Sequence, residues 1–196
     1  MNYHLTYVQT RKTFLRFELK HNFKFLNCTM TIAEFDHLER ETKSRLLLQC
    51  CGSPAWVEKM MGLPPVEDLI DLFEDAEEKW YECNEDDWKE AFLHHPKIGD
   101  ITALKKKFSS DAFAADEQMG IQGTTEKTLQ LLAEGNKRYE EKFGYIFIVC
   151  ATGKSADEML EMLHSRLLNK PEEEIKIAMD EQNKITKLRL EKIFEV

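Results

Sequence analysis

The chain has 196 residues and a formal net charge of -9, and 42% of its residues are hydrophobic and 32% charged. A chain of this length and composition typically forms one compact domain with a core of its own. Its apolar runs all fall well short of the ~20 residues that a membrane-spanning helix needs, and its negative charge repels the phosphate backbone of nucleic acids. We therefore expect neither a membrane nor a nucleic acid among its partners.

The cysteines and histidines show no pattern of a disulfide framework or a metal site. The cysteines are odd in number and include no C-x-x-C pair: Cys28, Cys50, Cys51, Cys83 and Cys150. Such thiols are typical of a reducing compartment, where they serve as small buried apolar side chains. The histidines include no pair at the spacing that places two metal ligands on one helix face. The sequence thus predicts no metal ion.

Residues 1–29 differ in character from the rest of the chain. Glu18 alone opposes a group of basic residues, with phenylalanines between them: Arg11, Lys12, Arg16, Lys20 and Lys24. The segment is either a basic targeting extension or the product of a start assigned upstream of Met30. In both cases we expect it to lie outside the domain, which comprises residues 30–196.

Helical signals dominate from residue 30 onward. Thr31 and Glu34 have the spacing of a capping box, the next helix stops at Gly52, and Ser53 followed by Pro54 begins a short helix. The last helix begins at Pro171. Between these, apolar periodicity and capping residues predict further helices over residues 66–83, 84–95, 101–108, 110–119, 125–143 and 155–167.

Residues 145–151 are the one stretch with an extended character. No second strand-like run lies near them, and an isolated strand is not stable, so we expect an extended apolar segment packed among helices. The predicted fold is therefore all-α, a single-domain bundle of about eight helices. Gly153-Lys154-Ser155 resembles the end of a P-loop, but Ile148 occupies the position of its first glycine, which argues against nucleotide binding.

His95 stands at a predicted helix end. Pro96 disfavours the α conformation at the residue before it, so the backbone becomes irregular there, a common setting for a catalytic histidine. A structural turn residue is the alternative. The adjacent His94 should point in another direction, so at most one of the two faces a given pocket.

Two charged residues far along the chain are candidates for the same site. Glu117 follows Phe113 by one helical turn, so its carboxylate is either on a buried face, with a shifted pKa suited to acid–base chemistry, or a solvated group. Arg189 closes one continuous stripe of the last helix with Ile175, Ala178, Gln182 and Ile185. It should point inward, where it either pairs with a carboxylate of the protein or binds an anionic ligand.

Taken in order, these features resemble the 2-oxo-4-hydroxy-4-carboxy-5-ureidoimidazoline (OHCU) decarboxylases of purine catabolism. No single motif decides this resemblance, but the ordered set is specific and runs from about Met30 to the last helix. The shared stretches are 48–56, 88–92, 95–100, 117–118 with Gly120, 138–140, 143–144, 147–151, 153–155, 166–169 and 188–190.

The resemblance implies a helical homodimer that removes CO2 from OHCU to give (S)-allantoin, with no metal and no organic cofactor. The family's catalytic histidine falls on His95 and its acidic partner on Glu117. Its substrate-binding residues fall on Pro96, Ala114, Gln118, Phe147, Ile148, Val149, Cys150, Ala151 and Arg189. Ala114 departs from the family pattern, because relatives often have a serine there, so a hydroxyl contact to the substrate is missing.

Two other functions stay open at this point. The same scaffold could act on a different ureido or imidazolone substrate, or the chain could be a helical binding module in which His95, Glu117 and Arg189 form a buried polar network. The chain ends in Phe194-Glu195-Val196 and not in a peroxisomal Ser-Lys-Leu tail, so we expect a cytoplasmic protein.

Overall fold

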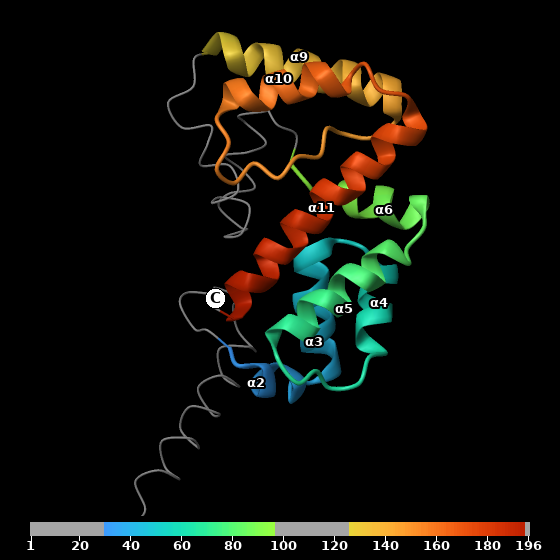
Figure 1. Ribbon diagram of the computed structural model, residues 1–196, viewed down its shortest axis with the longest axis vertical. Coiled ribbons are helices and arrows are strands. Elements are labelled where there is room, and N and C mark those ends of the chain that lie inside the picture. Colours follow the sequence, from blue (N-terminus) through green and yellow to red (C-terminus); the bar gives the residue numbers. More distant parts are fainter. Residues whose placement is uncertain (1–29, 97–125, 195–196) are drawn as a thin grey trace, which may run out of the picture.

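The computed structural model describes residues 30–96 and 126–194, and within them it contains eight α-helices and no strand (Figure 1). This confirms the all-α prediction. No helix in these two ranges combines the length and the apolar character needed to span a membrane. The helices are α2 (Ile32–Asp36), α3 (Arg40–Cys51), α4 (Pro54–Met61), α5 (Leu69–Tyr81), α6 (Glu85–Phe92), α9 (Glu126–Phe143), α10 (Ala156–Arg166) and α11 (Pro171–Phe194).

Local capping chemistry begins α2, α4 and α10 where the sequence predicts it. Thr31 and Ser155 each form a complete capping box, and Ser53 caps α4 ahead of Pro54 at its first turn. Helix α5 begins at Leu69, three residues later than predicted, because the Asp68 side chain accepts hydrogen bonds from two N–H groups of the first turn. A side-chain acceptor at this position satisfies donors that have no partner inside the helix.

Two helix ends depend on glycine in the left-handed conformation. Gly52 has φ 87° after α3, and Gly144 has φ 80° after α9, a backbone region that other residues adopt only at a cost. Helix α6 ends at Phe92, and residues 93–95 continue as a tight turn whose N–H groups bond to carbonyls three residues earlier. This agrees with the prediction that the chain leaves the helix before Pro96.

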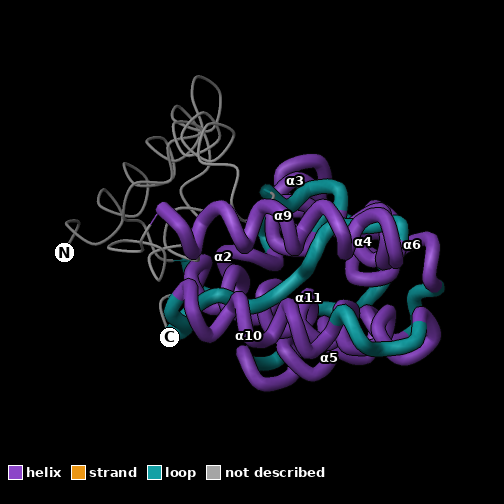
Figure 2. The backbone as a smooth tube through the Cα atoms, turned by 90° about the horizontal axis from the view of Figure 1, so that it is seen from above, coloured by secondary structure: helices purple, strands orange, loops and turns teal. Residues whose placement is uncertain are grey.

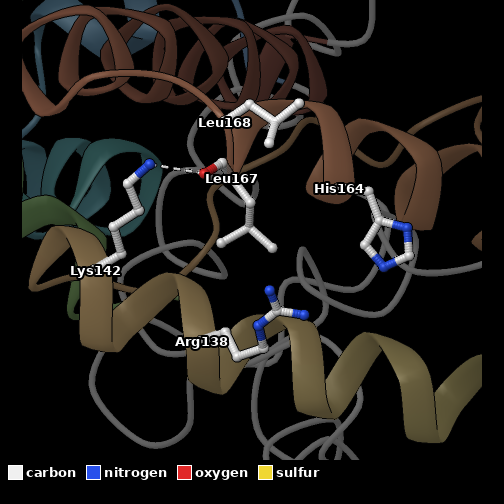
Figure 3. Close-up of a pocket in the computed structure, with 5 residues that line it drawn as sticks. All are labelled: Arg138, Lys142, His164, Leu167 and Leu168. Carbon is white, nitrogen blue, oxygen red and sulfur yellow. Dashed lines mark hydrogen bonds between the residues drawn. The ribbon is translucent and has the colours of Figure 1, made fainter.

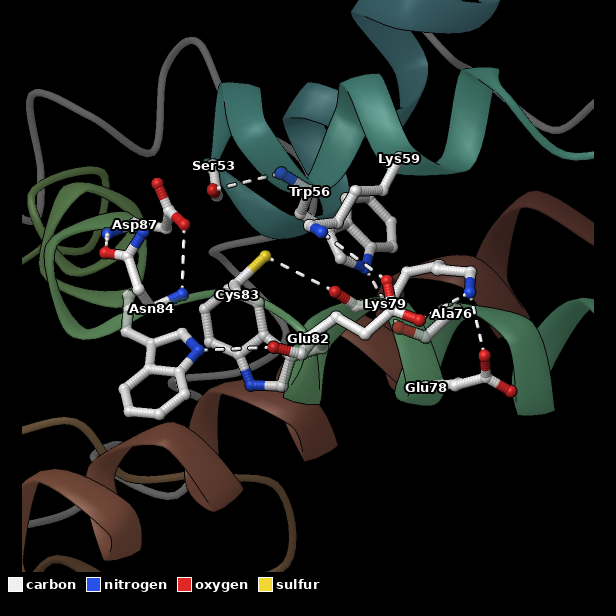
Figure 4. A network of polar contacts seen from close by, with 12 residues as sticks. Ser53, Trp56, Lys59, Ala76, Glu78, Lys79, Glu82, Cys83, Asn84 and Asp87 are labelled. Carbon is white, nitrogen blue, oxygen red and sulfur yellow. Dashed lines mark hydrogen bonds and ion pairs between the residues drawn. The ribbon is translucent and has the colours of Figure 1, made fainter.

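The long helix α11 organises the packing. It runs diagonally through the molecule, with α3 and α5 on one side and the parallel pair of α9 and α10 above it (Figure 1). Two buried tryptophans hydrogen-bond to neighbouring helices. The indole N–H of Trp80 on α5 donates to the carbonyl of Met179 on α11, 2.9 Å away. The indole N–H of Trp56 on α4 donates to the carbonyl of Ala76 on α5 (Figure 4). The predicted inward stripe of α11 is buried throughout.

The non-helical segment of residues 145–151 crosses the core between α10 and α11, as the loop after α9 in Figure 1 and in the tube of Figure 2 shows. All seven residues are buried, and none is in a helix or strand. Among the described residues, no main-chain hydrogen bond joins residues 145–150 to another backbone group. The predicted extended segment packed among helices is thus confirmed.

Candidate active site

The predicted site residues come from three parts of the described structure. His95 and Pro96 lie in the turn after α6, residues 147–151 form the buried segment, and Arg189 lies on the inner face of α11. The other three, Ala114, Glu117 and Gln118, lie outside the described residues.

The turn that carries His95 lies against the end of α3. The N–H of His95 donates to the carbonyl of Phe92 at 3.2 Å, and both His95 and Pro96 are half-buried. The exposed His94 packs over Gly52, whose missing side chain leaves room for it: a Cβ there would lie 3.1 Å from the Cβ of His94. The glycine that ends α3 therefore also allows the close approach of the histidine turn.

The same helix end is where Arg189 binds. Its Nη1 donates to the carbonyls of Gln49 at 3.2 Å and Cys50 at 3.3 Å, and the amide Nε2 of Gln182, two turns earlier on α11, donates to the carbonyl of Cys51. These carbonyls belong to the last turn of α3, where the helix leaves acceptors without intrahelical partners and carries partial negative charge. A buried guanidinium here stabilises the end of α3, and Gly52, which follows that end, lies against the turn that carries His95.

The third component, the buried segment, begins next to the histidine turn. The ring of Tyr145 contacts the ring of Phe92, with centroids 5.2 Å apart, and Phe92 is three residues before His95. Burial raises the pKa of the Tyr145 hydroxyl to about 12, so this group stays protonated at neutral pH. The structure thus brings the histidine turn, the end of α3 with Arg189 and the start of the buried segment into one region.

Side chains of three helices contact the main chain of this segment. Asn136 on α9 accepts from the N–H of Phe147 at 3.2 Å, and Glu181 on α11 accepts from the N–H of Cys150 at 2.7 Å. Between them, Arg166 on α10 donates to the carbonyl of Ile148 at 2.8 Å. All three side chains are buried.

Arg166 is itself part of a buried ionic cluster. Its guanidinium pairs with the carboxylate of Glu174 at 2.6 Å and stacks over the ring of Phe147, 4.7 Å from the centroid. Glu174 also accepts hydrogen bonds from the hydroxyl of Tyr139 and from Asn169, so its charge is fully partnered although the residue has no exposed surface. A buried carboxylate is tolerated only with such partners.

Comparison with known proteins identifies the scaffold. Residues 36–191 match the model of the family described as OHCU decarboxylase. The chain belongs to the OHCU decarboxylase family. It is 37% identical over 148 residues, 74% of its length, to the uric acid degradation bifunctional protein TTL of Arabidopsis thaliana. It is 40% identical over 101 residues, 52% of its length, to the 2-oxo-4-hydroxy-4-carboxy-5-ureidoimidazoline decarboxylase of Amia calva.

The solved structures agree with this family. A crystal structure of OHCU decarboxylase in the presence of (S)-allantoin is 37% identical, covers 81% of this chain and 100% of its own, and has a TM-score of 0.67. A crystal structure of (S)-allantoin synthase, 17% identical, shares the fold with a TM-score of 0.63 over 84% of this chain. The matched regions make up 45% of the Arabidopsis protein and 58% of the Amia protein, so the chain spans about half the length of these curated relatives.

Within this OHCU decarboxylase fold, the sequence does not predict the three polar contacts to the segment backbone or the buried Glu174 that pairs with Arg166. Asn136, Arg166, Glu174 and Glu181 each lie on a helix in a charged or polar stretch, and nothing in such a stretch distinguishes a buried polar residue from a solvated one. One weak signal existed: Glu174 and Glu181 directly precede Ile175 and Gln182, which belong to the predicted inward stripe of α11. A wide buried face of that helix would include both glutamates.

A separate pocket of about 430 Å³ lies against α9 and α10 (Figure 3). It is lined by Arg138, Lys142, His164, Leu167 and Leu168 and shares no residue with the predicted site. Lys142 donates from Nζ to the carbonyls of Leu167 and Asn169, each at 2.7 Å, and so satisfies acceptors at the end of α10. Among the described residues, no cluster of three or more His, Cys, Asp and Glu side chains has the arrangement of a metal site.

Proposed function

We propose that this chain is an OHCU decarboxylase, which converts OHCU to (S)-allantoin in the degradation of uric acid. The observation that carries the proposal is the match to a solved OHCU decarboxylase over that protein's whole length, at 37% identity and with (S)-allantoin present. The curated relatives, named for OHCU decarboxylation and uric acid degradation, support the same reaction.

The substrate itself supplies the electron sink for this reaction. The carbon that loses CO2 carries a hydroxyl group and lies next to a ring imine. The electron pair of the breaking C–C bond moves toward that imine, whose nitrogen takes up a proton, and this leaves an enol. The enol hydroxyl then loses its proton and becomes the ring carbonyl, while a proton adds to the ureido-bearing ring carbon from one face to give a single enantiomer. The proposed chemistry therefore requires neither a metal ion nor an organic cofactor, and the protein contributes orientation, proton transfer and stabilisation of charge.

We assign the roles as follows. His95, positioned by Glu117, hydrogen-bonds the hydroxyl and carboxylate end of the substrate and transfers the proton. Arg189 binds an anionic or carbonyl oxygen, while Pro96 and Ala114 border the substrate. Gln118 and the main chain of Phe147, Ile148, Val149, Cys150 and Ala151 bind the ureido group and the ring amides. The proximity of the His95 turn, the Arg189 helix end and the Tyr145 start of the segment supports this assignment.

The assignment can be tested by substitution of the two catalytic residues. A positioned general acid or base contributes about 10²- to 10⁴-fold to a rate, so His95→Ala and Glu117→Gln should each lower kcat by about that factor. Allantoin formation from freshly generated OHCU, followed by circular dichroism, measures both the rate and the enantiomer. His94→Ala is the matched control, because His94 is exposed and adjacent to His95.

The outcomes separate the competing functions. Full activity of either catalytic variant, with the circular dichroism spectrum of folded protein, would contradict the site assignment. A wild-type chain that turns over a different ureido or imidazolone compound, but not OHCU, would show that the scaffold is shared and the substrate is not. A wild-type chain with no turnover of any of these compounds would favour the binding module.

We further infer a homodimer in the cytoplasm. The dimer follows from the family resemblance, and sedimentation velocity of the purified chain over a range of concentrations tests it directly. A single species with the mass of one chain at all concentrations would contradict it. Expression of the full chain with a fluorescent tag, followed by fractionation, tests the location.

A further inference from the structure

The backbone of residues 145–151 is buried, and within the ranges 30–96 and 126–194 no helix or sheet ladder satisfies its polar groups. Buried main-chain N–H and C=O groups cost free energy unless they are hydrogen-bonded, and regular secondary structure is the usual way to satisfy them. Here polar side chains take that role, since Asn136, Arg166 and Glu181 bind the N–H of Phe147, the C=O of Ile148 and the N–H of Cys150. The shape of the segment is therefore set by three helices at once.

These contacts leave the backbone N–H and C=O of Val149 available to a ligand. Within the part of the chain that the structure describes, no hydrogen bond engages the N–H or the C=O of Val149, which lies between the two contacted residues Ile148 and Cys150. A donor and an acceptor on one residue, side by side on a fixed backbone, match the N–H and C=O pattern of a ureido or amide group. Fixed main-chain groups bind such a ligand without the entropic cost of ordering a loop.

We propose that Asn136, Arg166 and Glu181 are positioning residues, which hold the main chain of residues 147–151 in the geometry that binds the ureido group through Val149. This inference rests on the proposed function, because it names how the substrate-binding segment of that reaction is shaped. The three residues do not touch the substrate. They act through the backbone groups that do.

Glu181 offers the sharpest test of the three. Its Oε2 accepts from the N–H of Cys150 at 2.7 Å, and its Oε1 pairs with Nζ of Lys184 at 2.5 Å, whose side chain is 59% exposed. The contact to the segment and the contact to the surface can therefore be removed separately. Arg166 is less suitable, because its removal would leave the charge of Glu174 buried without its ionic partner.

The experiment compares Glu181→Ala, Glu181→Gln and Lys184→Ala in steady-state decarboxylation of OHCU. Glu181→Ala should raise KM about five- to tenfold, the effect of one displaced hydrogen bond to the substrate, with kcat changed much less. Glu181→Gln keeps an oxygen acceptor for the N–H of Cys150 and should restore a KM close to that of the wild type. Lys184→Ala removes only the surface ion pair and should leave both constants unchanged.

A merely structural role for Glu181 would give a different result. In that case Glu181→Ala would lower stability without a selective rise in KM, and an unchanged KM in the folded variant would overturn the proposal. If Glu181→Ala does not fold, Glu181→Asp takes its place, because the shorter side chain withdraws the carboxylate from Cys150 while keeping the charge. Glu181→Asp should then raise KM by the same factor. An unchanged KM in the folded Glu181→Asp variant would overturn the proposal.

A second measurement needs no substitution. Val149 is one of five valines in the chain, so labelling with ¹⁵N-valine gives few amide signals. Titration with (S)-allantoin should shift the Val149 amide strongly and leave that of Val57, which is buried inside α4, unchanged. A Val149 signal that does not move while allantoin binds would overturn the proposal. A wild-type chain that neither decarboxylates OHCU nor binds allantoin would instead contradict the proposed function.

Discussion

At the scale of single residues, buried polar groups in this protein mostly serve the backbone. The sequence leaves Arg189 with two uses, a carboxylate partner or an anionic ligand, and the structure adds a third, since its guanidinium binds the carbonyls that end α3. Gln182 binds the next carbonyl of the same helix. A guanidinium carries five N–H donors in a planar fork, so one arginine can in principle bind a helix end and an oxygen of a ligand, which is the proposed role of Arg189.

Cys51 gives a residue-scale prediction about pH. Complete burial raises the pKa of its thiol from 9.0 to about 12. The unfolded chain can ionise this thiol above pH 9, whereas the folded chain cannot until about pH 12, so the free energy of unfolding should fall across this window. The loss from Cys51 should be about 1 kcal/mol between pH 8 and pH 10.

Urea unfolding at a series of pH values checks this, with Cys51→Ala as the control. The variant should lose less stability than the wild type over the same interval. Burial also raises the pKa of Cys83 to about 11 and that of Tyr145 to about 12, so some decline should remain in the variant. If the free energy of unfolding fell equally with pH in the wild type and in Cys51→Ala, Cys51 would ionise as readily in the folded chain as in the unfolded one.

At the scale of elements, two helix ends with the same backbone geometry face different surroundings. Gly52 and Gly144 have φ of 87° and 80°. A Cβ on Gly52 would lie 3.1 Å from the Cβ of His94 and 3.2 Å from the carbonyl oxygen of Ala91, whereas a Cβ on Gly144 would meet nothing within 4 Å. A side chain at Gly144 would therefore add backbone strain alone, whereas a side chain at Gly52 would add the same strain and also crowd the histidine turn.

We predict different outcomes for alanine at these two positions. Gly144→Ala should lower the free energy of unfolding by about 1 kcal/mol, the strain of a left-handed residue with a side chain. Gly52→Ala should cost about 2–4 kcal/mol, because overpacking adds to that strain, and it should also lower decarboxylation by displacing the turn that carries His95. Denaturant unfolding and initial rates for both variants measure the two effects. A Gly52→Ala protein with full activity would show that the turn does not depend on the end of α3.

At the scale of the whole molecule, the first described residues, from Met30 to α2, pack against the end of α11. The N–H of Met30 donates to the carbonyl of Ile193, 3.1 Å away, and the ring of Phe35 packs edge-on against that of Phe194. The family match begins at residue 36, shortly after this contact. These observations support the proposal that the domain comprises residues 30–196, with residues 1–29 outside it.

A chain that begins at Met30 should therefore keep its fold and its activity. We expect a melting temperature and a kcat close to those of the full chain, because the main-chain contact of Met30 and the Phe35 packing are both retained. Differential scanning calorimetry and the OHCU assay on the two chains check this. A large loss of either property in the shorter chain would place residues 1–29 inside the functional domain.

Local chemistry was enough to predict most of this fold. Capping side chains such as Thr31 and Ser155, proline at helix starts and glycine at helix ends act over four or five residues, so the sequence alone shows where helices begin and end. The inward direction of Arg189 and the extended segment among helices were predictable for the same reason, since both follow from residue spacing and apolar character. The family and its proposed reaction followed from the order of motifs along the chain.

The tertiary structure decided which polar groups meet. Asn136, Arg166 and Glu181 come from three helices, and their contacts to the segment depend on how those helices pack, which no local spacing encodes. The approach of the His95 turn to the end of α3, with Arg189 bound there, has the same origin. Hydrogen bonds act over about 3 Å, so residues far apart in sequence interact only after the hydrophobic core has fixed the helices around them. The family resemblance groups His95 with Arg189, and the packing of α3, α6 and α11 places the histidine turn beside the helix end that Arg189 binds.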